Sequence, residues 1–199
     1  MENDRKKITE QNLIRCAKEE FLQKGYAKAN LRDICRRAGV TTGAFYFSFA
    51  SKEALLDAIL APTIAGYTAL MSAMAQREIE NPETAEQNEQ EIVTYLCSHR
   101  QECELLLEKC AGSKYEAFRE QLLANMQDAF GCYYEKYLGF SPDPELVRIM
   151  AGMRFHGYIE LIRGDNTMDE CLRLARAIGI HADAGTAAMI EYLKNNAHQ

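Results

Sequence analysis

The stretch from Asn30 to Glu53 reads NLRDICRRAGVTTGAFYFSFASKE, and it predicts two short helices joined by a tight corner. From Leu31 to Ala38, apolar residues recur at three- and four-residue spacing, which is the pattern of a helix with one buried face. Asn30 is the predicted N-cap of this helix. Gly39 ends it, because glycine adopts the left-handed backbone conformation without a steric penalty.

The second helix of the corner is short and carries an unusual surface. Thr41 is its predicted N-cap, and the helix runs from Thr42 to about Ser48. Phe45 and Phe49 are four residues apart and can dock inward together. A helix of two turns is not stable alone, so its neighbours have to hold it. The residues expected to face away from the core are Thr42, Gly43, Tyr46 and Phe47.

A third helix follows directly, with Ser51 as its cap and Lys52 in its first turn. A cation at that place opposes the helix dipole. The placement is reasonable if Lys52 faces an anion such as a DNA phosphate. The whole stretch therefore predicts a helix-turn-helix, whose second helix enters the major groove.

Many positions around this corner agree in register with one known family. They are Asp33-Ile34, Ala38-Gly39-Val40-Thr41, Gly43, Phe45-Tyr46, Phe49, Ser51-Lys52-Glu53 and Leu55, with Ile14, Ala17, Phe21 and Gly25 upstream. This pattern resembles the N-terminal signature of the TetR family of bacterial one-component regulators. Agreement over about fifty residues is far more specific than a lone helix-turn-helix corner.

The remaining chain predicts further amphipathic helices, so the expected fold class is all-α. The first helix is expected at about 8–24, after a loose charged arm at 1–7. Pro62 is expected to kink or interrupt the fourth helix. The small residues around 179–186 are expected to interrupt the last helix. The resemblance implies a helix-turn-helix DNA-binding domain of three helices at 1–50 and a helical effector-binding and dimerisation domain at 51–199.

The charge of the chain is segregated along the sequence. The 199 residues, 47% of them hydrophobic, carry a net charge of −6, which alone argues against nucleic acid. Residues 1–52 nevertheless hold 11 Lys and Arg against 6 Asp and Glu, a balance of +5, and the remainder carries −11. A basic head suits a polyanion, and an acidic body keeps the rest of the chain away from it.

The resemblance assigns DNA contacts residue by residue. Arg32 can take a guanine edge, Thr42 a base or a thymine methyl, and Tyr46 with Lys52 can fix the register on phosphates. Ala44 and Phe47 replace more polar residues of the family, so we expect readout tilted toward thymine methyls. The predicted DNA-binding set is Asn30, Arg32, Thr41, Thr42, Gly43, Ala44, Tyr46, Phe47 and Lys52.

The same resemblance implies a homodimer on a palindromic operator in double-stranded DNA, released by a small-molecule effector that the sequence does not identify. The two last long helices would pair with those of a second subunit, and the middle helices would enclose an apolar cavity with a few polar groups. The residues on suitable faces are Tyr67, Met71, Tyr95, Cys103, Tyr115, Phe118, Met126, Met153 and His156. The expected function is that of a ligand-responsive regulator, in the first place a repressor.

Seven cysteines, an odd number, argue against a disulfide framework. His99, Cys103 and Cys110 share one helical face, as a soft-metal site would require, but Leu106 lies there too and makes a core stripe the better interpretation. We expect no metal and no cofactor. A cysteine-based redox sensor using the same head is one alternative, and an activator is another.

Other classes of protein find little support. The sequence contains no Gly-x-Ser-x-Gly elbow, no phosphate-binding glycine loop and no His-Glu-x-x-His, so we do not expect an enzyme. Purely apolar runs stay far below the roughly 18 residues of a membrane span, and the N-terminus has no apolar signal core. We expect a cytoplasmic protein without a membrane partner.

Overall fold

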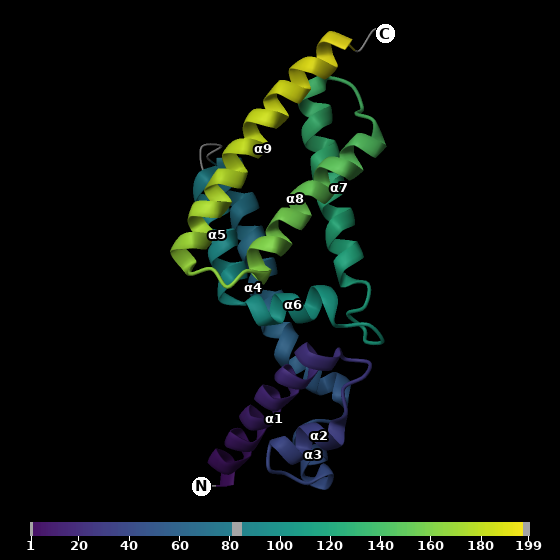
Figure 1. The fold of residues 1–199 in the computed structure, drawn as a ribbon, viewed down its shortest axis with the longest axis vertical. Coiled ribbons are helices and arrows are strands. Elements are labelled where there is room, and N and C mark those ends of the chain that lie inside the picture. The colour runs from purple at the N-terminus through teal and green to yellow at the C-terminus, as the bar shows by residue number, and fades with distance from the viewer. Residues whose placement is uncertain (1, 81–84, 197–199) are drawn as a thin grey trace. The chain divides into compact units, whose positions relative to one another are not determined.

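The structure, a computed structural model, describes residues 2–80 and 85–196. Within these residues it contains helices and no strand, which confirms the predicted all-α class (Figure 1). The helices are α1 (Glu2–Lys24), α2 (Leu31–Arg37), α3 (Thr42–Ser48), α4 (Lys52–Glu80), α5 (Ala85–Ser98), α6 (Arg100–Glu108), α7 (Phe118–Leu138), α8 (Pro144–Arg163) and α9 (Met168–Asn196).

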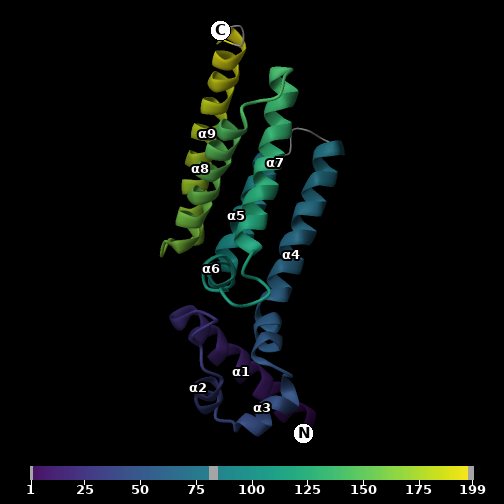
Figure 2. The same cartoon turned by 90° about the vertical axis from the view of Figure 1, so that its right-hand side faces the viewer.

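The helices fall into two compact units. The first unit holds α1 to α4 together with α6 and the segment up to Phe118, and the second holds α5 and α7 to α9. Figure 2 shows α2 and α3 beside α1 within the first unit. By packing, α4 and α6 therefore belong with the N-terminal helices. The functional boundary between residues 50 and 51 stays a prediction.

One hydrophobic cluster forms the core of the first unit. Leu13 and Phe21 of α1, Ile34 of α2 and Phe45 of α3 are fully buried in it. Burial of one such side chain contributes about 1.5–3 kcal/mol, so the short helices α2 and α3 depend on this cluster. Helices α4 and α6 complete it with Leu55, Leu56, Ile59, Leu60, Leu105 and Leu106.

The second unit is held by two smaller clusters. Val93 and Cys97 of α5 pack against α8 and α9, and Tyr134 and Leu138 of α7 pack against Val147 of α8. Several large apolar side chains of α8 and α9 stay exposed. They are Ile149, Met153, Ile180 and Tyr192.

Helix α1 begins at Glu2, so the prediction of a loose arm was wrong for residues 2–7, and Met1 lies outside the described residues. The helix is held by its packed residues further along, because Leu13, Ala17 and Phe21 are fully buried in the first unit. Lys6 and Glu10 add an i,i+4 ion pair at 3.9 Å. The basic residues at 5–7 are consequently carried on a helix.

Helix α4 is also longer than expected, since it runs without interruption from Lys52 to Glu80 through Pro62. The helix is not interrupted at the proline, because buried residues on both sides of it, among them Leu60 and Thr63, hold the helix, and a kink at Pro62 stays a prediction. By length and composition alone, Lys52–Arg77 would also pass for a membrane span, with a mean hydropathy of 1.5. Core helices pass the same test, and the first turns of α4 bury their leucines inside the first unit.

Helix α9 is continuous from Met168 to Asn196, so the glycines in its middle do not interrupt it. Gly179 is buried where α5 approaches α9. A Cβ atom at this position would lie 2.6 Å from Oε2 of Glu89. The glycine therefore permits a close approach between two helices, which is why it does not act as a helix terminator.

Candidate nucleic-acid interface

Hydrogen bonds lock the corner between α2 and α3. The Asn30 side chain caps α2 as predicted, accepting from the backbone N–H of Arg32 at 2.9 Å. Gly39 has a φ of +71°, the left-handed conformation expected of it. The Thr41 hydroxyl caps α3 by accepting from the N–H of Ala44 at 3.1 Å. The corner therefore has the geometry that the sequence predicts.

Helix α3 is anchored by one face and free on the other. Phe45 is fully buried, and its ring centroid lies 5.9 Å from that of Phe49. Tyr46 and Phe47 point outward, with 60% and 86% of their surface exposed. A Phe side chain with this exposure contributes almost nothing to the stability of the fold. Helix α3 therefore presents an apolar surface that does not pack within the protein.

The other predicted contact residues surround this surface. Asn30, Arg32, Thr41, Thr42 and Gly43 are exposed, and Ala44 is half-buried. Among the ion pairs of the described residues, none involves the Arg32 guanidinium. The arrangement offers a cation, hydroxyl groups and aromatic rings on one capped corner, and their roles as DNA contacts stay predictions.

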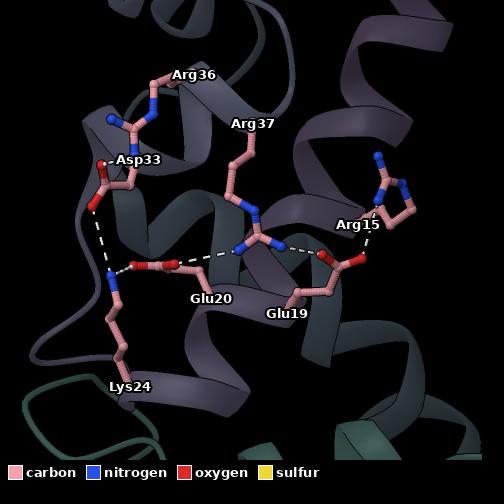
Figure 3. Close-up of polar contacts among 7 residues, drawn as sticks. All are labelled: Arg15, Glu19, Glu20, Lys24, Asp33, Arg36 and Arg37. Carbon is pink, nitrogen blue, oxygen red and sulfur yellow. Dashed lines mark hydrogen bonds and ion pairs between the residues drawn. The ribbon is translucent and has the colours of Figure 1, made fainter.

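The neighbouring arginines are engaged within the protein. Arg36 donates to Asp33 at 2.8 Å, and Arg37 donates to Glu19 and Glu20 of α1 (Figure 3). In the structure both arginines belong to a chain of ion pairs that ties α2 to α1.

Glu20 is the central member of that chain and was not predicted. Its side chain is only 3% exposed, and it lies 2.6 Å from Lys24 and 3.4 Å from Arg37 (Figure 3). Lys24 in turn lies 3.6 Å from Asp33 of α2. A buried carboxylate needs such partners, because burial without them is costly. The available signal was that Glu20 stands three residues after Ala17, on the inward face of α1.

Lys52 is also bound within the protein. Its ammonium donates to the carbonyl oxygens of Tyr26 at 2.7 Å and Ala29 at 3.2 Å, and it lies 4.3 Å from the Tyr26 ring centroid. Burial lowers the pKa of Lys52. The phosphate contact predicted for Lys52 would have to use the one remaining donor of the ammonium or replace these interactions, and it stays a prediction.

The nine predicted effector residues are divided between the two units. Tyr67 and Met71 lie on α4 and Cys103 on α6, while Tyr115 and Phe118 pack against the core of the first unit. The second unit contains the other four, Tyr95, Met126, Met153 and His156. Tyr115 precedes α7.

Two of the four effector residues in the second unit have surroundings that differ from the interior of a cavity. Met153 is 61% exposed. The exposed His156 has its Nδ1 atom 2.8 Å from the Gly152 carbonyl of its own helix. The assignment of the nine residues to an effector stays a prediction.

The cysteines give little support to redox sensing. All are buried except Cys132. Burial raises the pKa of Cys35, and it raises the pKa of Cys110 to about 11. A raised pKa keeps a thiol protonated and therefore unreactive. In the described part of the chain, no group of three or more His, Cys, Asp or Glu is arranged to hold a metal ion.

A capped two-helix corner with an exposed second helix, in a chain of helices, defines a helix-turn-helix regulatory protein. Residues 13–59 match the family of bacterial regulatory proteins named tetR. The N-terminal part of the chain therefore carries the DNA-binding domain of the TetR family of bacterial regulatory proteins.

Similar proteins agree with this assignment. The A-factor receptor protein of Streptomyces griseus is 46% identical over 52 residues, which are 26% of this chain and 19% of that protein. The chain thus matches about a fifth of the receptor's length. A transcriptional regulator of the TerR/AcrR family from Aquifex aeolicus shares the fold, with a TM-score of 0.56 and 20% identity over 86% of this chain and 98% of its own.

A third similar protein is NalD, the secondary repressor of the MexAB-OprM multidrug efflux pump in Pseudomonas aeruginosa. Its structure has a TM-score of 0.50 and 20% identity, over 85% of this chain and 93% of NalD. At this identity the likeness concerns the fold alone.

Proposed function

We propose that this protein is a ligand-responsive transcriptional repressor that binds a palindromic operator as a homodimer. The observation that carries the proposal is the outward face of α3, where Phe47 is 86% exposed on a helix anchored by the buried Phe45. An exposed aromatic side chain on the second helix of a capped corner has the placement of a residue that reads bases in the major groove.

Each side chain around this face has a distinct proposed role. Arg32 donates both ends of its guanidinium to a guanine, and Thr42 contacts a base through its hydroxyl or methyl group. Phe47 contacts thymine methyls, while Tyr46 and the helix N-termini at Asn30 and Thr41 bind phosphates and set the register. Gly43 and Ala44 leave room for the approach of the DNA backbone and bases.

The proposed dimer uses α8 and α9. Ile149 and Met153 stand four residues apart on α8, and both are exposed, as are Ile180 and Tyr192 of α9. Exposed apolar residues at helical spacing favour the packing of these helices against a second copy. Two heads held about 34–36 Å apart would then meet successive major grooves.

Release by an effector follows the usual logic of population shift. The ligand binds more tightly to a conformation in which the two heads have another spacing. It therefore lowers the affinity for the operator, at most by the ratio of its affinities for that conformation and for the DNA-binding one. The relatives support this part of the proposal by their names, since one is a receptor and another a repressor. We retain the nine predicted residues as candidates for the effector site, and we propose that the protein works in the cytoplasm and is not an enzyme.

The direct experiment is a fluorescence anisotropy titration with duplexes that tile the region upstream of the gene. The proposal expects one duplex to bind with two protomers and to outcompete a scrambled duplex of the same composition. A reporter transcribed from that region should be repressed in cells, whereas stimulated transcription would favour an activator. Equal binding to all duplexes would contradict sequence-specific regulation.

The reading of thymine methyls has a test of its own. Replacing the operator thymines one at a time by uracil removes single methyl groups, each worth about 0.8 kcal/mol when buried, or roughly fourfold in affinity. Wild-type protein should be sensitive at one position in each half-site, and the Phe47→Ala variant should lose that sensitivity. If wild type and variant respond alike to every replacement, Phe47 does not read a methyl group.

Arg32→Ala provides the matched comparison for the polar contact. It should cost about 1–3 kcal/mol of operator binding and relax the preference for guanine at one position, while leaving the uracil response unchanged.

A further inference from the structure

The first turn of α4 and the turn that joins α1 to α2 meet at one side chain, Lys52. Both of its acceptors, the carbonyl oxygens of Tyr26 and Ala29, belong to that turn, which ends at the Asn30 cap of α2. Two of the three donors of the ammonium are therefore used by the segment that determines where α2 begins. The face of the Tyr26 ring lies against the same charge.

We propose that Lys52 is a positioning residue, which fastens the 25–29 turn to α4 and thereby holds α2 and α3 in place, and that it does not bind a DNA phosphate. The proposal rests on the proposed function, because the element that is positioned is the DNA-reading helix. It assigns Lys52 a different role from the one that the family resemblance implies.

The surroundings of Lys52 favour this role. The side chain is half-buried, and burial disfavours its charged form, so the ammonium depends on nearby acceptors. The two carbonyl oxygens are such acceptors, and they also offset the unfavourable position of a cation in the first turn of α4. A DNA phosphate could reach at most the one remaining donor of this half-buried ammonium.

The same turn is fixed from a second direction. The backbone N–H of Tyr26 donates to the carbonyl of Lys109, just after α6, at 2.8 Å. On α4, Glu53 accepts from the backbone N–H of Lys114 at 3.1 Å, and Asp57 binds the Lys114 ammonium at 2.7 Å. The first turns of α4 thus join the 25–29 turn to the segment that follows α6. Lys52 is the member of this joint that reaches the helix-turn-helix.

Hydrogen exchange in the absence of DNA tests the positioning role. Lys52→Met removes the charge and keeps an unbranched stem of similar length. Lys28→Met is the matched control, because it removes a charge from the same turn at an exposed side chain. We expect the hydrogen-bonded amides of Tyr26, Ala29 and Ile34 to exchange roughly tenfold faster in Lys52→Met only, as local opening becomes easier. Unchanged exchange in this variant would overturn the proposal.

Labelling of the wild-type protein needs no variant, so it decides the matter even if Lys52→Met does not fold. Trace acetic anhydride followed by mass spectrometry reports the accessibility of each lysine. The proposal expects Lys52 to react much more slowly than Lys28 without DNA, and at the same rate when an operator duplex is bound. A Lys52 that reacts as fast as Lys28 and is protected by the duplex would be a phosphate contact.

The salt dependence of duplex binding gives the third readout. Each lost phosphate contact lowers the slope of log K against log salt by about 0.9 per head. Lys52→Met should weaken operator binding without changing this slope, and a slope reduced by that amount would refute the proposal. If no duplex is bound at all, the proposed function fails, whereas exchange and labelling without DNA still decide the role of Lys52.

Discussion

The two compact units bury their apolar side chains in different ways. Of the described residues, sixteen buried ones form a single cluster in the first unit, drawn from α1 to α4 and α6, from the 25–29 turn and from Cys110 just after α6. The second unit has clusters of five and three, and large apolar side chains such as Ile180 and Met153 remain exposed on its helices. Apart from the outward face of α3 and the exposed Ile8 and Met71, the first unit therefore buries its large apolar side chains within one chain, whereas α8 and α9 of the second unit present faces suited to a partner.

The largest expected effect is on the free energy of unfolding, and it compares one buried leucine in each unit. Leu13→Ala, in the continuous cluster, should lower the free energy of unfolding by about 4–5 kcal/mol, because a tightly enclosed site cannot collapse around the cavity. Leu161→Ala, in the cluster of five, should cost about 2–3 kcal/mol, since its surroundings can relax. Urea denaturation at one fixed protein concentration measures both. Equal losses would remove the distinction between the cores.

Two isoleucines with the same exposure, 57%, test the faces instead of the cores. Ile180→Glu on α9 should convert the proposed dimer into a monomer and lower operator affinity by roughly 100-fold, since two linked heads gain at least that factor over one. Ile8→Glu on α1 should leave the oligomeric state unchanged. Light scattering on both variants gives the answer, and a dimer that survives Ile180→Glu would place the interface elsewhere.

The helix-turn-helix could be predicted from the sequence because its signals are local. Asn30 and Thr41 cap their helices, Gly39 adopts a positive φ, and Phe45 and Phe49 share the inward face. All of these depend on residues within four positions of one another. The tertiary packing of the first unit is consistent with these local signals.

The errors lie where distant residues decide. Pro62 and Gly179 look like helix breakers, but packing from other elements keeps α4 and α9 continuous. The partners of Lys52, 23 and 26 residues away, are invisible in the sequence. The charge count likewise includes Arg37 among the cations expected to face a polyanion, although carboxylates of α1 bind it.

The ion pairs between α1 and α2 allow a smaller effect to be measured. Glu20→Gln removes the charge of a side chain that is buried between Lys24 and Arg37, and it should destabilise the protein by about 1–2 kcal/mol. The value is below that of a fully buried pair because both partners are partly exposed. Glu19→Gln is the control, at no more than about 0.5 kcal/mol, because its pairs with Arg15 and Arg37 are both exposed. A control as destabilising as Glu20→Gln would show that burial of Glu20 is unimportant.

The smallest effect concerns two glycines of α9. Gly179→Ala brings a Cβ atom within 2.8 Å of both carboxylate oxygens of Glu89, which is ion-paired with Arg154, and should cost about 1 kcal/mol. Gly185→Ala meets open space and should stabilise the helix by about 0.5–1 kcal/mol. Opposite signs in thermal unfolding are the expected result. If both variants gain stability, the close approach of α5 to α9 is not required.

The central claim is that α3 reads duplex DNA twice per assembly. Its most direct test is an anisotropy titration at low ionic strength, with duplexes from the upstream region of the gene and the Phe47→Ala variant in parallel. We expect two protomers on one palindrome, with affinity falling steeply as salt rises and reduced in the variant. A protein that stays monomeric, or binds no duplex better than a scrambled one, would contradict the claim.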